Sequence, residues 1–528
     1  MKEVLYVQAG SFANYIGTHF WNTQESYFTY GLDKDSDVDH DVSFREGVTL
    51  QGEATFCPRL LLFDRKANFG NVSATSGLYG YDEDETDDAP APLWSSTVAE
   101  YRQTRIPPST YHAQLDAEAA DAGEQAANRR ENEAQKHEPQ PPRVVPSDVR
   151  YWSDYSRVFF HPRTIQKLPD RAEWEDAEGD WGASREAFGR YDADTDVMEE
   201  AFRPFVEECD TVQGIQVMHD TATFGGFTDS LLTVIRDDFP KLPCLAFPLL
   251  SGATPGSFDV EDALSFRRAI NDALCLRSLD SLSTLTVPIQ SPSTWAPGDW
   301  LGGINLNRTS LYHTSAIVSA HIESATLPVR LKGSMDDLSS MCERFSLGGG
   351  VRFAHLSGVF PFSSSLVPTR DFDIRTYDFS VSPSNGTGTL DKYDPTEFTK
   401  IYVSRGFSGI ERRQFDQWAE QRRPVPYSIH SPAYPLPSSF PRFFTPPPPT
   451  PPPSMRTLAA LSSTTRTAHL FASHAALVTL GAARHADVLA GMGLELDEVR
   501  ELRDALWVLC DACAGGEERD VEMGEDEE

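Results

Sequence analysis

The sequence predicts an α/β fold in which a mainly parallel sheet is covered by helices on both faces. Three short segments carry the apolar pattern of buried strands: Val4–Val7, Gly214–Met218 and Leu242–Leu250. Each is followed by small or polar residues and then by a longer stretch with helical periodicity. Strands that alternate with helices in this way are typical of parallel sheets, because the chain must cross back over the sheet between successive strands.

The opening segment carries the most specific pattern in the chain. The apolar run Val4–Val7 stops at Gln8, Ala9 and Gly10, and a helix-like stretch then continues past Asn14. A strand, a tight turn and a helix N-terminus in this order direct backbone N–H groups toward one point, which is an arrangement that binds phosphate. Gln8, Gly10 and Asn14 are therefore candidates for a nucleotide site.

The residues after the first predicted helix contain one more candidate site residue and then a segment that lacks the apolar pattern of a protein core. Pro58–Asp64 is predicted to be a buried strand that delivers Asp64 to a loop. Residues 81–147 form an acidic and proline-rich insertion, with the charge run Asp82–Asp88, and we predict that it is partly helical and largely disordered. Residues 1–80 and 148–330 would then be two parts of one domain.

The second part of that domain continues the alternation. A small-residue loop, Thr221–Phe227, is predicted between the strand Gly214–Met218 and the helix Ser230–Phe239. Further predicted helices are Phe202–Cys209, Val260–Leu282 and Leu311–Leu327.

A second, smaller α+β domain is predicted over residues 331–430. Residues 431–454 are rich in proline and are predicted to be an extended, exposed linker, although such a segment could also bind an aromatic groove. Residues 455–514 are predicted to form two amphipathic C-terminal helices, Thr457–Leu480 and His485–Ala512, and residues 515–528 an acidic disordered tail.

Composition limits the classes of function. The formal net charge is -33, which argues against nucleic acid as a partner, because phosphate binding needs clustered Lys and Arg. No apolar run approaches the roughly 20 residues of a membrane-spanning helix, and the N-terminus lacks the features of a targeting segment. The seven scattered cysteines fit a reducing compartment, and the histidines show no metal-ligand spacing.

Several motifs resemble the tubulins and, more specifically, the Misato family. The tubulin-like motifs are Gln8-Ala9-Gly10, Asn14, Ile16-Gly17, Phe20-Trp21 and Pro58–Asp64. The Misato-like motifs are Trp152–Tyr155, His161–Arg163, Glu207–Gln216 and Leu311–Pro328. This resemblance implies a tubulin/FtsZ-like nucleotide-domain fold over about residues 1–80 and 148–410, and a role in mitochondrial distribution and inheritance.

The chain departs from the tubulin pattern at the second phosphate loop. Where tubulins carry a glycine-rich run, this chain has Thr221–Phe227, in which only Gly225 matches a glycine position. Phe224 and Phe227 add bulk where a phosphate would have to come close to the backbone. Asp229 is expected to place a negative charge near the phosphates. Lys66 replaces an acidic residue of tubulins, and Arg277-Ser278 lies where the guanine-side asparagine would be expected.

The two aspartates that could take part in hydrolysis are open to two interpretations. Asp336 and Asp337 lie about where tubulins carry the carboxylate that acts on the next subunit's nucleotide, but capping of the following helix explains them as well. Gln8, Gly10, Asn14, Asp64, Gly225 and Gly226 are thus expected to form a degenerate nucleotide site, with no cofactor, no metal and no catalytic residue.

The resemblance therefore implies a non-enzymatic factor for mitochondrial distribution, morphology and inheritance of mitochondrial DNA. We expect it in the cytoplasm and on the cytosolic face of the mitochondrial outer membrane, attached peripherally if at all. Its expected partners are proteins of the mitochondrial surface, the cytoskeleton or a chaperonin. The alternative is a tubulin-type GTPase that hydrolyses GTP on self-assembly.

Overall fold

The computed structural model describes most of the two predicted domains. The described residues are 2–28, 36–48, 54–72, 109–118, 149–170, 180–253, 255, 262–346, 352–363, 376–381, 396–445 and 453–514. The charge run Asp82–Asp88, most of the 81–147 insertion, the proline run 446–452 and the acidic tail 515–528 lie outside them, so the predictions made for those segments stay predictions.

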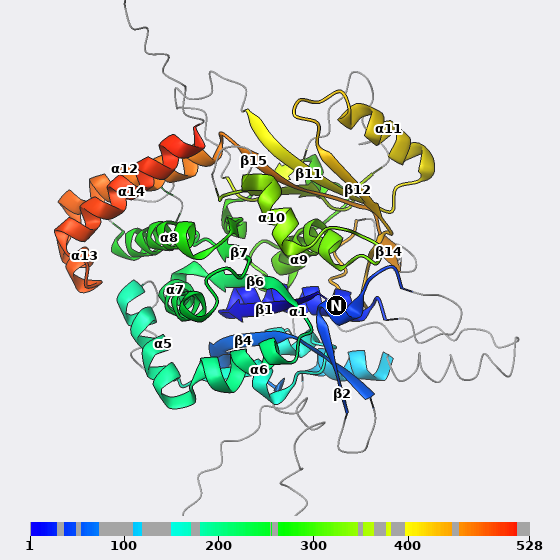
Figure 1. Cartoon of the computed structure of the whole chain (residues 1–528), viewed down its shortest axis with the longest axis horizontal. Helices are drawn as coiled ribbons and strands as arrows, with labels where there is room; N and C mark the ends of the chain where they lie inside the picture. Colours follow the sequence, from blue (N-terminus) through cyan, green and yellow to red (C-terminus); the bar gives the residue numbers. More distant parts are fainter. Residues whose placement is uncertain are drawn as a thin grey trace, which may run out of the picture.

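The first domain is built on a six-stranded, entirely parallel sheet, as the sequence predicts (Figure 1). Its spatial order is β5-β4-β1-β6-β7-β8. The strands are β1 (Glu3–Ala9), β4 (Leu60–Arg65), β5 (Ile165–Leu168), β6 (Val212–Asp220), β7 (Cys244–Leu249) and β8 (Leu285–Thr286). The longer helices are α1 (Ser11–Glu25), α5 (Trp181–Thr195), α7 (Thr221–Asp238), α8 (Ala263–Leu282) and α9 (Leu311–Thr326).

The strand β1 shows why this sheet needs helices on both faces. Leu5 and Val7 pack into one core with residues of α5, α7 and α8, whereas Val4 and Tyr6 pack into another with residues of α1. Successive side chains of a strand point to opposite faces, so a strand that is buried throughout must be covered on both. The remaining elements of this domain are short: η1 (His40–Val42), β2 (Phe44–Val48), β3 (Ala54–Pro58), η2 (Lys66–Phe69), η5 (Trp152–Tyr155), η6 (Pro162–Thr164), the π-helical η7 (Val197–Phe202) and α6 (Arg203–Glu207).

The insertion contributes one helical segment to this domain. Residues 110–118 are helical, and within them Tyr111 and Leu115 are buried in the core beneath α1. The Tyr111 hydroxyl lies 2.9 Å from that of Tyr312 on α9. The expectation of a partly helical insertion therefore holds for these residues, which also add to the core.

The second domain is a five-stranded sheet in the order β10-β9-β15-β11-β12. Its strands are β9 (His355–Val359), β10 (Tyr377–Asp378), β11 (Glu397–Arg405), β12 (Tyr427–Ser431) and β15 (Thr457–Thr464). Its helices are α10 (Leu338–Ser346) and α11 (Gly409–Ala419). The 3-10 turns η8 (Pro292–Thr294) and η9 (Asp299–Leu301) precede α9 in the chain, and η10 (Leu327–Arg330) follows it directly.

The prediction of a helix over Thr457–Leu480 is wrong in its first part. Residues 457–464 form β15, which pairs antiparallel with β9 on one side and β11 on the other and is buried at every residue. Its alanines and leucines favour a helix locally, but pairing with two strands overrides that preference. The C-terminal helices are α12 (Thr467–Arg484), α13 (Ala486–Gly491) and α14 (Leu496–Cys513), which lie at the left in Figure 1.

The exposed-linker prediction is wrong for residues 431–445. Tyr434, Phe440 and Phe443 are buried in the core of the second domain, and β13 (Tyr434–Pro435) pairs with β14 (Ser454–Met455). Aromatic side chains between the prolines give this segment enough apolar surface to be held in place. The chain that precedes the proline run is thus part of the folded body.

Candidate functional site

The candidate site lies at the carboxyl ends of β1 and β6. From β1 the chain proceeds to β4 and β5 on one side of the sheet, and then returns to β6 on the other side. Open parallel sheets bind ligands in the crevice where the strand order reverses in this manner. Gly10 follows β1 at this edge and Asp220 ends β6, so the two residues meet at the reversal point.

The side chain of Asp220 caps the N-terminus of α1. Its two carboxylate oxygens accept hydrogen bonds from the backbone N–H groups of Phe12 and Ala13, each at 2.9 Å. These are N–H groups of the first turn, which have no partner inside the helix. Gly10 has φ 104° and supplies no side-chain cap, and a Cβ there would lie 2.6 Å from the Asp220 carboxylate. Gly10 is therefore required both for its backbone conformation and for the close approach of Asp220.

Asn14 and Asp64 contact each other, as neighbours in one site should. Asn14 Nδ2 donates to Asp64 Oδ2 at 3.0 Å, and Asn68 Nδ2 donates to Asp64 Oδ1 at 2.7 Å. Asp64 is fully buried within β4 rather than in the loop that the sequence predicts. Burial raises the pKa of its carboxyl, while these hydrogen bonds oppose the rise.

Gln8 serves packing behind the site. Its side chain is fully buried, and its amide atoms have no hydrogen-bond partner among the described residues. A Cβ on Gly17 would lie 2.1 Å from Gln8 Oε1, so Gly17 allows the helix α1 to sit against the end of β1. The two motif residues thus belong to the strand–helix contact.

Asp272 on α8 is a third buried carboxylate at this edge, and sequence reasoning missed it. It accepts hydrogen bonds from Thr221 Oγ1 at 2.5 Å and from Ser251 Oγ at 2.7 Å, and one from the Ser251 backbone N–H. Burial raises its pKa to about 6. Asp220 was missed as well, although an aspartate directly after a predicted parallel strand was a usable signal.

The predicted loop Thr221–Phe227 does not exist as a loop. α7 begins at Thr221, directly after β6, so this segment is helical throughout. Gly225 and Gly226 lie inside the helix, where a Cβ would be 3.1 Å from the Trp181 ring and 2.3 Å from the Trp181 carbonyl oxygen, respectively. These glycines therefore permit close packing of α5 on α7 and do not line a phosphate loop.

The two phenylalanines of α7 have a different role from the predicted one. Phe224 and Phe227 are buried in the core, and the Phe227 ring lies 5.2 Å from those of Phe63 and Phe188. The sequence suggests that they obstruct a ligand, but both rings are packed among core residues of the sheet and of the neighbouring helices. The prediction that Asp229 places a negative charge near the phosphates is wrong. Asp229 lies two turns into α7, where it pairs with Arg185 at 3.2 Å.

Other predicted residues lie away from the crevice. Asp337 accepts a hydrogen bond from the Ser340 backbone N–H at 2.8 Å and thereby caps α10, in agreement with the capping interpretation. It also pairs with Lys2 at 2.5 Å, which places it at the amino ends of the strands. Arg277 on α8 lies 3.9 Å from Glu501 of α14. Lys66 is exposed at the start of η2.

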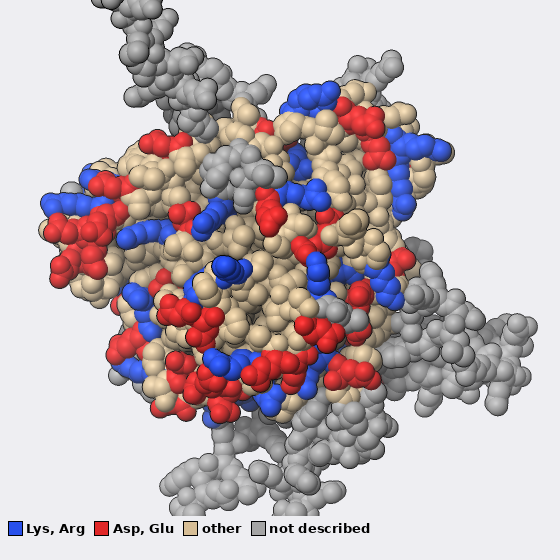
Figure 2. Space-filling view, in the orientation of Figure 1, with Lys and Arg blue, Asp and Glu red and all other residues tan. Residues whose placement is uncertain are grey.

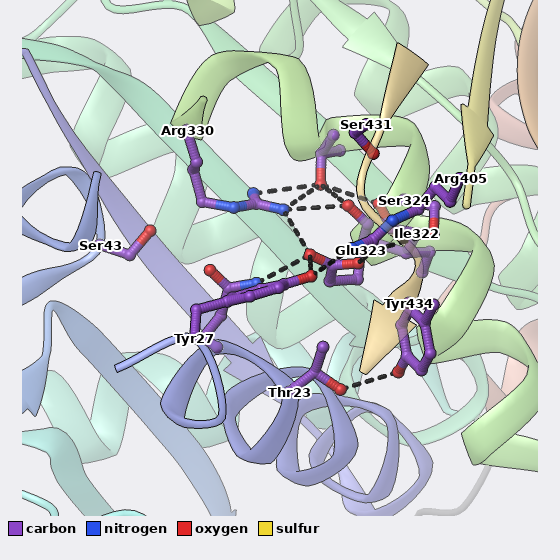
Figure 3. Close-up of polar contacts among 12 residues, drawn as sticks. Thr23, Tyr27, Ser43, Ile322, Glu323, Ser324, Arg330, Arg405, Ser431 and Tyr434 are labelled. Atoms are coloured by element: carbon purple, nitrogen blue, oxygen red, sulfur yellow. Dashed lines mark hydrogen bonds and ion pairs between the residues drawn. The ribbon is translucent and has the colours of Figure 1, made fainter. Parts of the chain in front are cut away.

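A second polar cluster is buried between the two domains (Figure 3). Glu323 of α9 accepts hydrogen bonds from Arg405 of β11, from Gln24 Nε2 at 3.0 Å and from the Tyr27 hydroxyl at 2.9 Å. Arg330 Nη2 lies 3.7 Å from Glu323 Oε1, and both side chains are fully buried. The Arg405 Nη2 atom also donates to the Tyr27 hydroxyl at 2.7 Å. The cluster joins the end of α1 and the central helix α9 to the sheet of the second domain.

The described part of the chain contains no group of three or more His, Cys, Asp or Glu side chains that could hold a metal ion. Among its helices, none has the length and apolar character that crossing a bilayer demands.

Comparison with known proteins agrees with this architecture. Residues 2–117 match the model of the Misato Segment II tubulin-like domain, and residues 141–331 match that of the tubulin domain. Protein dml1 of Aspergillus niger is 31% identical over 534 residues, which cover 96% of this chain and 98% of that protein. Protein DML1 of Gibberella zeae is 37% identical over 70% of this chain and 69% of its own. Protein misato of Drosophila melanogaster is 27% identical over 65% and 62%. This chain therefore belongs to the Misato/DML1 family of tubulin-like proteins.

Proposed function

We propose that this chain is a non-enzymatic, tubulin-like factor that acts in mitochondrial distribution and morphology and in the inheritance of mitochondria and their DNA. The observation that carries the non-enzymatic part is the start of α7 directly at the end of β6. A phosphate loop needs several backbone amides that curve around the ligand. In a helix only the first-turn amides remain free for that purpose, and here they begin beside the Asp220 carboxylate.

The charge at the crevice supports the same proposal. Asp64, Asp220 and Asp272 all come from elements that meet at the carboxyl edge of the sheet. Nucleotide phosphates are anionic, and sites that bind them supply Lys, Arg or a metal ion to offset that charge. The three carboxylates would instead repel the phosphates of GTP.

We further propose that the protein works through protein partners on the cytosolic face of the mitochondrial outer membrane and in the cytoplasm. Figure 2 shows acidic side chains gathered over the lower part of the first domain, around α6. Glu199, Glu200, Glu207 and Glu208 are exposed there. Such a surface favours basic protein surfaces over nucleic acid or anionic lipid.

The deciding experiment is titration of GTP into the purified full chain by calorimetry, together with a phosphate-release assay. We expect no saturable heat and no turnover above background. Binding of GTP would contradict the first part of the proposal, and steady turnover that is lost in an Asp337→Ala variant would restore the alternative of a tubulin-type GTPase. The location is tested by adding protease to intact mitochondria, which should digest the attached protein; full protection would contradict it.

The GTPase alternative has one structural point in its favour. The N-termini of α1 and α7 both lie at the crevice, which is the orientation that a phosphate-binding edge requires. The calorimetric titration separates the two proposals directly, because a functional GTPase must bind the nucleotide before it can act.

A further inference from the structure

The outward face of helix α12 carries no acidic side chain. α12 packs against α14, and the inner faces of both helices are buried in the core of the first domain. The exposed side chains described on α12 are uncharged except at its last residue: Ser473, Ala476, Thr479, Leu480 and Arg484. Ser473, Ala476 and Leu480 follow one another at intervals of three and four residues, so they form one stripe along the helix. This stripe contrasts with a chain in which 24% of the residues are charged.

Two large apolar side chains of α14 are exposed beside α12. Trp507 is 41% and Val508 67% exposed, and Leu480 on α12 is 52% exposed. Burial raises the pKa of the Cys510 thiol, and a hydrogen bond with the Ala472 backbone opposes the rise, which places this part of α14 against the first half of α12. Tryptophan is enriched at the centres of protein interfaces, because it offers a large contact area on a rigid ring. The exposed pair on α14 therefore has the character of a contact surface.

Acidic side chains surround this apolar pair. Asp504 precedes Trp507 by three residues and Asp511 follows it by four, so all three lie on the same side of α14. From Glu495 to Asp511 the chain has six acidic residues and two arginines. Figure 2 shows acidic side chains gathered at the left of the view, where α13 and α14 lie in Figure 1. An apolar centre with an acidic rim complements a partner that is apolar in the middle and basic at its edges.

We propose that the outer faces of α12 and α14 dock a basic amphipathic helix of a partner protein. We call this surface, with Leu480, Trp507 and Val508 as its apolar contacts, the C-terminal face. A third helix can lie along two packed helices through the same kind of side-chain contacts that join those two. Its apolar stripe would cover Trp507, and its Lys and Arg side chains would reach Asp504 and Asp511. The inference rests on the proposed function in one respect, because it names the class of protein through which the chain would act.

Charge favours this occupant over two others. A second copy of the chain would bring the same acidic residues against one another, and like charges across an interface lower affinity. An anionic membrane surface would be repelled by them as well. A basic helix, in contrast, gains from the acidic rim and from the apolar centre. The remaining possibility is that these apolar side chains are exposed singly and bind nothing, which is common on protein surfaces.

The test uses the purified full chain and a synthetic amphipathic helix of Leu and Lys that carries a fluorophore. Binding is followed by fluorescence anisotropy at constant ionic strength, and a peptide of the same pattern made of Leu and Glu is the comparison. We expect saturable binding of the Leu/Lys peptide, with a gain of helical circular dichroism, and no binding of the Leu/Glu peptide. The double variant Trp507→Ala/Val508→Ala should weaken the binding at least about tenfold, because truncation of a central aromatic contact commonly has an effect of that size.

Ile410→Ala is the matched control, because Ile410 is an apolar residue of α11 that is 64% exposed and lies outside the C-terminal face. A chain with a net charge of -33 attracts cationic peptides in general, and this comparison removes that contribution. Ile410→Ala should bind as the wild-type chain does. Asp504→Asn/Asp511→Asn should weaken the binding more at low salt than at high salt. If the Trp507 double variant has a lowered Tm, Val508→Ala alone provides the same test.

Three outcomes would overturn the inference. The first is that the Trp507 double variant and Ile410→Ala bind the Leu/Lys peptide equally well. The second is that the Leu/Glu peptide binds as tightly as the Leu/Lys peptide. The third is a wild-type dimer in sedimentation that Trp507→Ala dissociates, because a second copy would then cover the face. None of these results bears on GTP, so the non-enzymatic proposal is decided separately by its own calorimetric titration.

Discussion

The buried cluster around Glu323 makes a sharp prediction about stability. Glu323 is the carboxylate that lies between Arg330 and Arg405 in this cluster, and all three side chains are at most 1% exposed. The substitution Glu323→Gln keeps the size of the side chain but removes its charge. Two guanidinium groups would then remain buried without the carboxylate that offsets them.

The expected loss is about 3–5 kcal/mol of unfolding free energy, which is the range for removing one partner of a buried ion pair. The remaining hydrogen bonds of Arg330, to Thr326 Oγ1 at 3.2 Å and to the Glu323 carbonyl at 3.0 Å, satisfy some N–H groups but supply no full negative charge. A loss of this size would lower Tm by about 3–5 °C, because the entropy of unfolding of a chain of 528 residues is about 1.1 kcal/mol/K.

Urea unfolding followed by tryptophan fluorescence and by circular dichroism gives the measurement. Asp497→Asn is the control, because Asp497 and Arg500 form an exposed pair with side chains 83% and 64% accessible. That variant should stay within about 1 kcal/mol of the wild-type chain. A Glu323→Gln variant that unfolds at the same urea concentration as Asp497→Asn would refute the reasoning, since it would mean that water or a rearranged side chain compensates the charge.

Three further predictions concern the core, the pH dependence of stability and self-association. Phe227→Ala should lower the free energy of unfolding by about 3–5 kcal/mol, because the Phe227 ring is fully buried. Phe159→Ala should cost little, because Phe159 is 47% exposed. Equal losses would contradict the assignment of Phe227 to the core. Burial raises the pKa of the Asp220 carboxyl from 3.8 to about 7, so between these two pH values the native state binds more protons than the unfolded state. The free energy of unfolding should therefore fall as the pH rises from 4 to 7. Asp220→Asn should flatten that dependence, and an unchanged slope would count against the raised pKa of Asp220. Sedimentation at high protein concentration should show a monomer or small oligomer with or without GTP, whereas nucleotide-dependent polymers would favour the alternative of a self-assembling, tubulin-type GTPase.

The strand-and-helix order of the first domain could be predicted because each strand is short, apolar and followed by a helix of regular period. β1, β6 and β7 appear where the sequence predicts them, and α8 and α9 match within a few residues. β15 could not be predicted in the same way, because Thr457–Thr464 is rich in alanine and leucine and becomes a strand only through its two partners.

The candidate site was predictable in position but not in composition. The opening motif led to Gln8, Gly10 and Asn14, and the predicted strand Pro58–Asp64 led to Asp64. The structure brings Asn14 and Asp64 into direct contact. Asp220 and Asp272 escaped notice because their importance lies in contacts to residues more than 20 positions away. Gly225 and Gly226 were misassigned because a glycine needed for helix packing and one needed for a phosphate loop look identical in a sequence.

The position of the phenylalanines in α7 changes the argument for the proposed lack of nucleotide binding. If Phe224 and Phe227 merely obstructed the ligand, smaller residues at these positions would reopen the site. Because both rings belong to the core, their replacement would instead weaken the packing of α7 on the sheet. The proposed lack of nucleotide binding therefore rests on the helix that begins at Thr221 and on the carboxylate that precedes it, and not on the two rings.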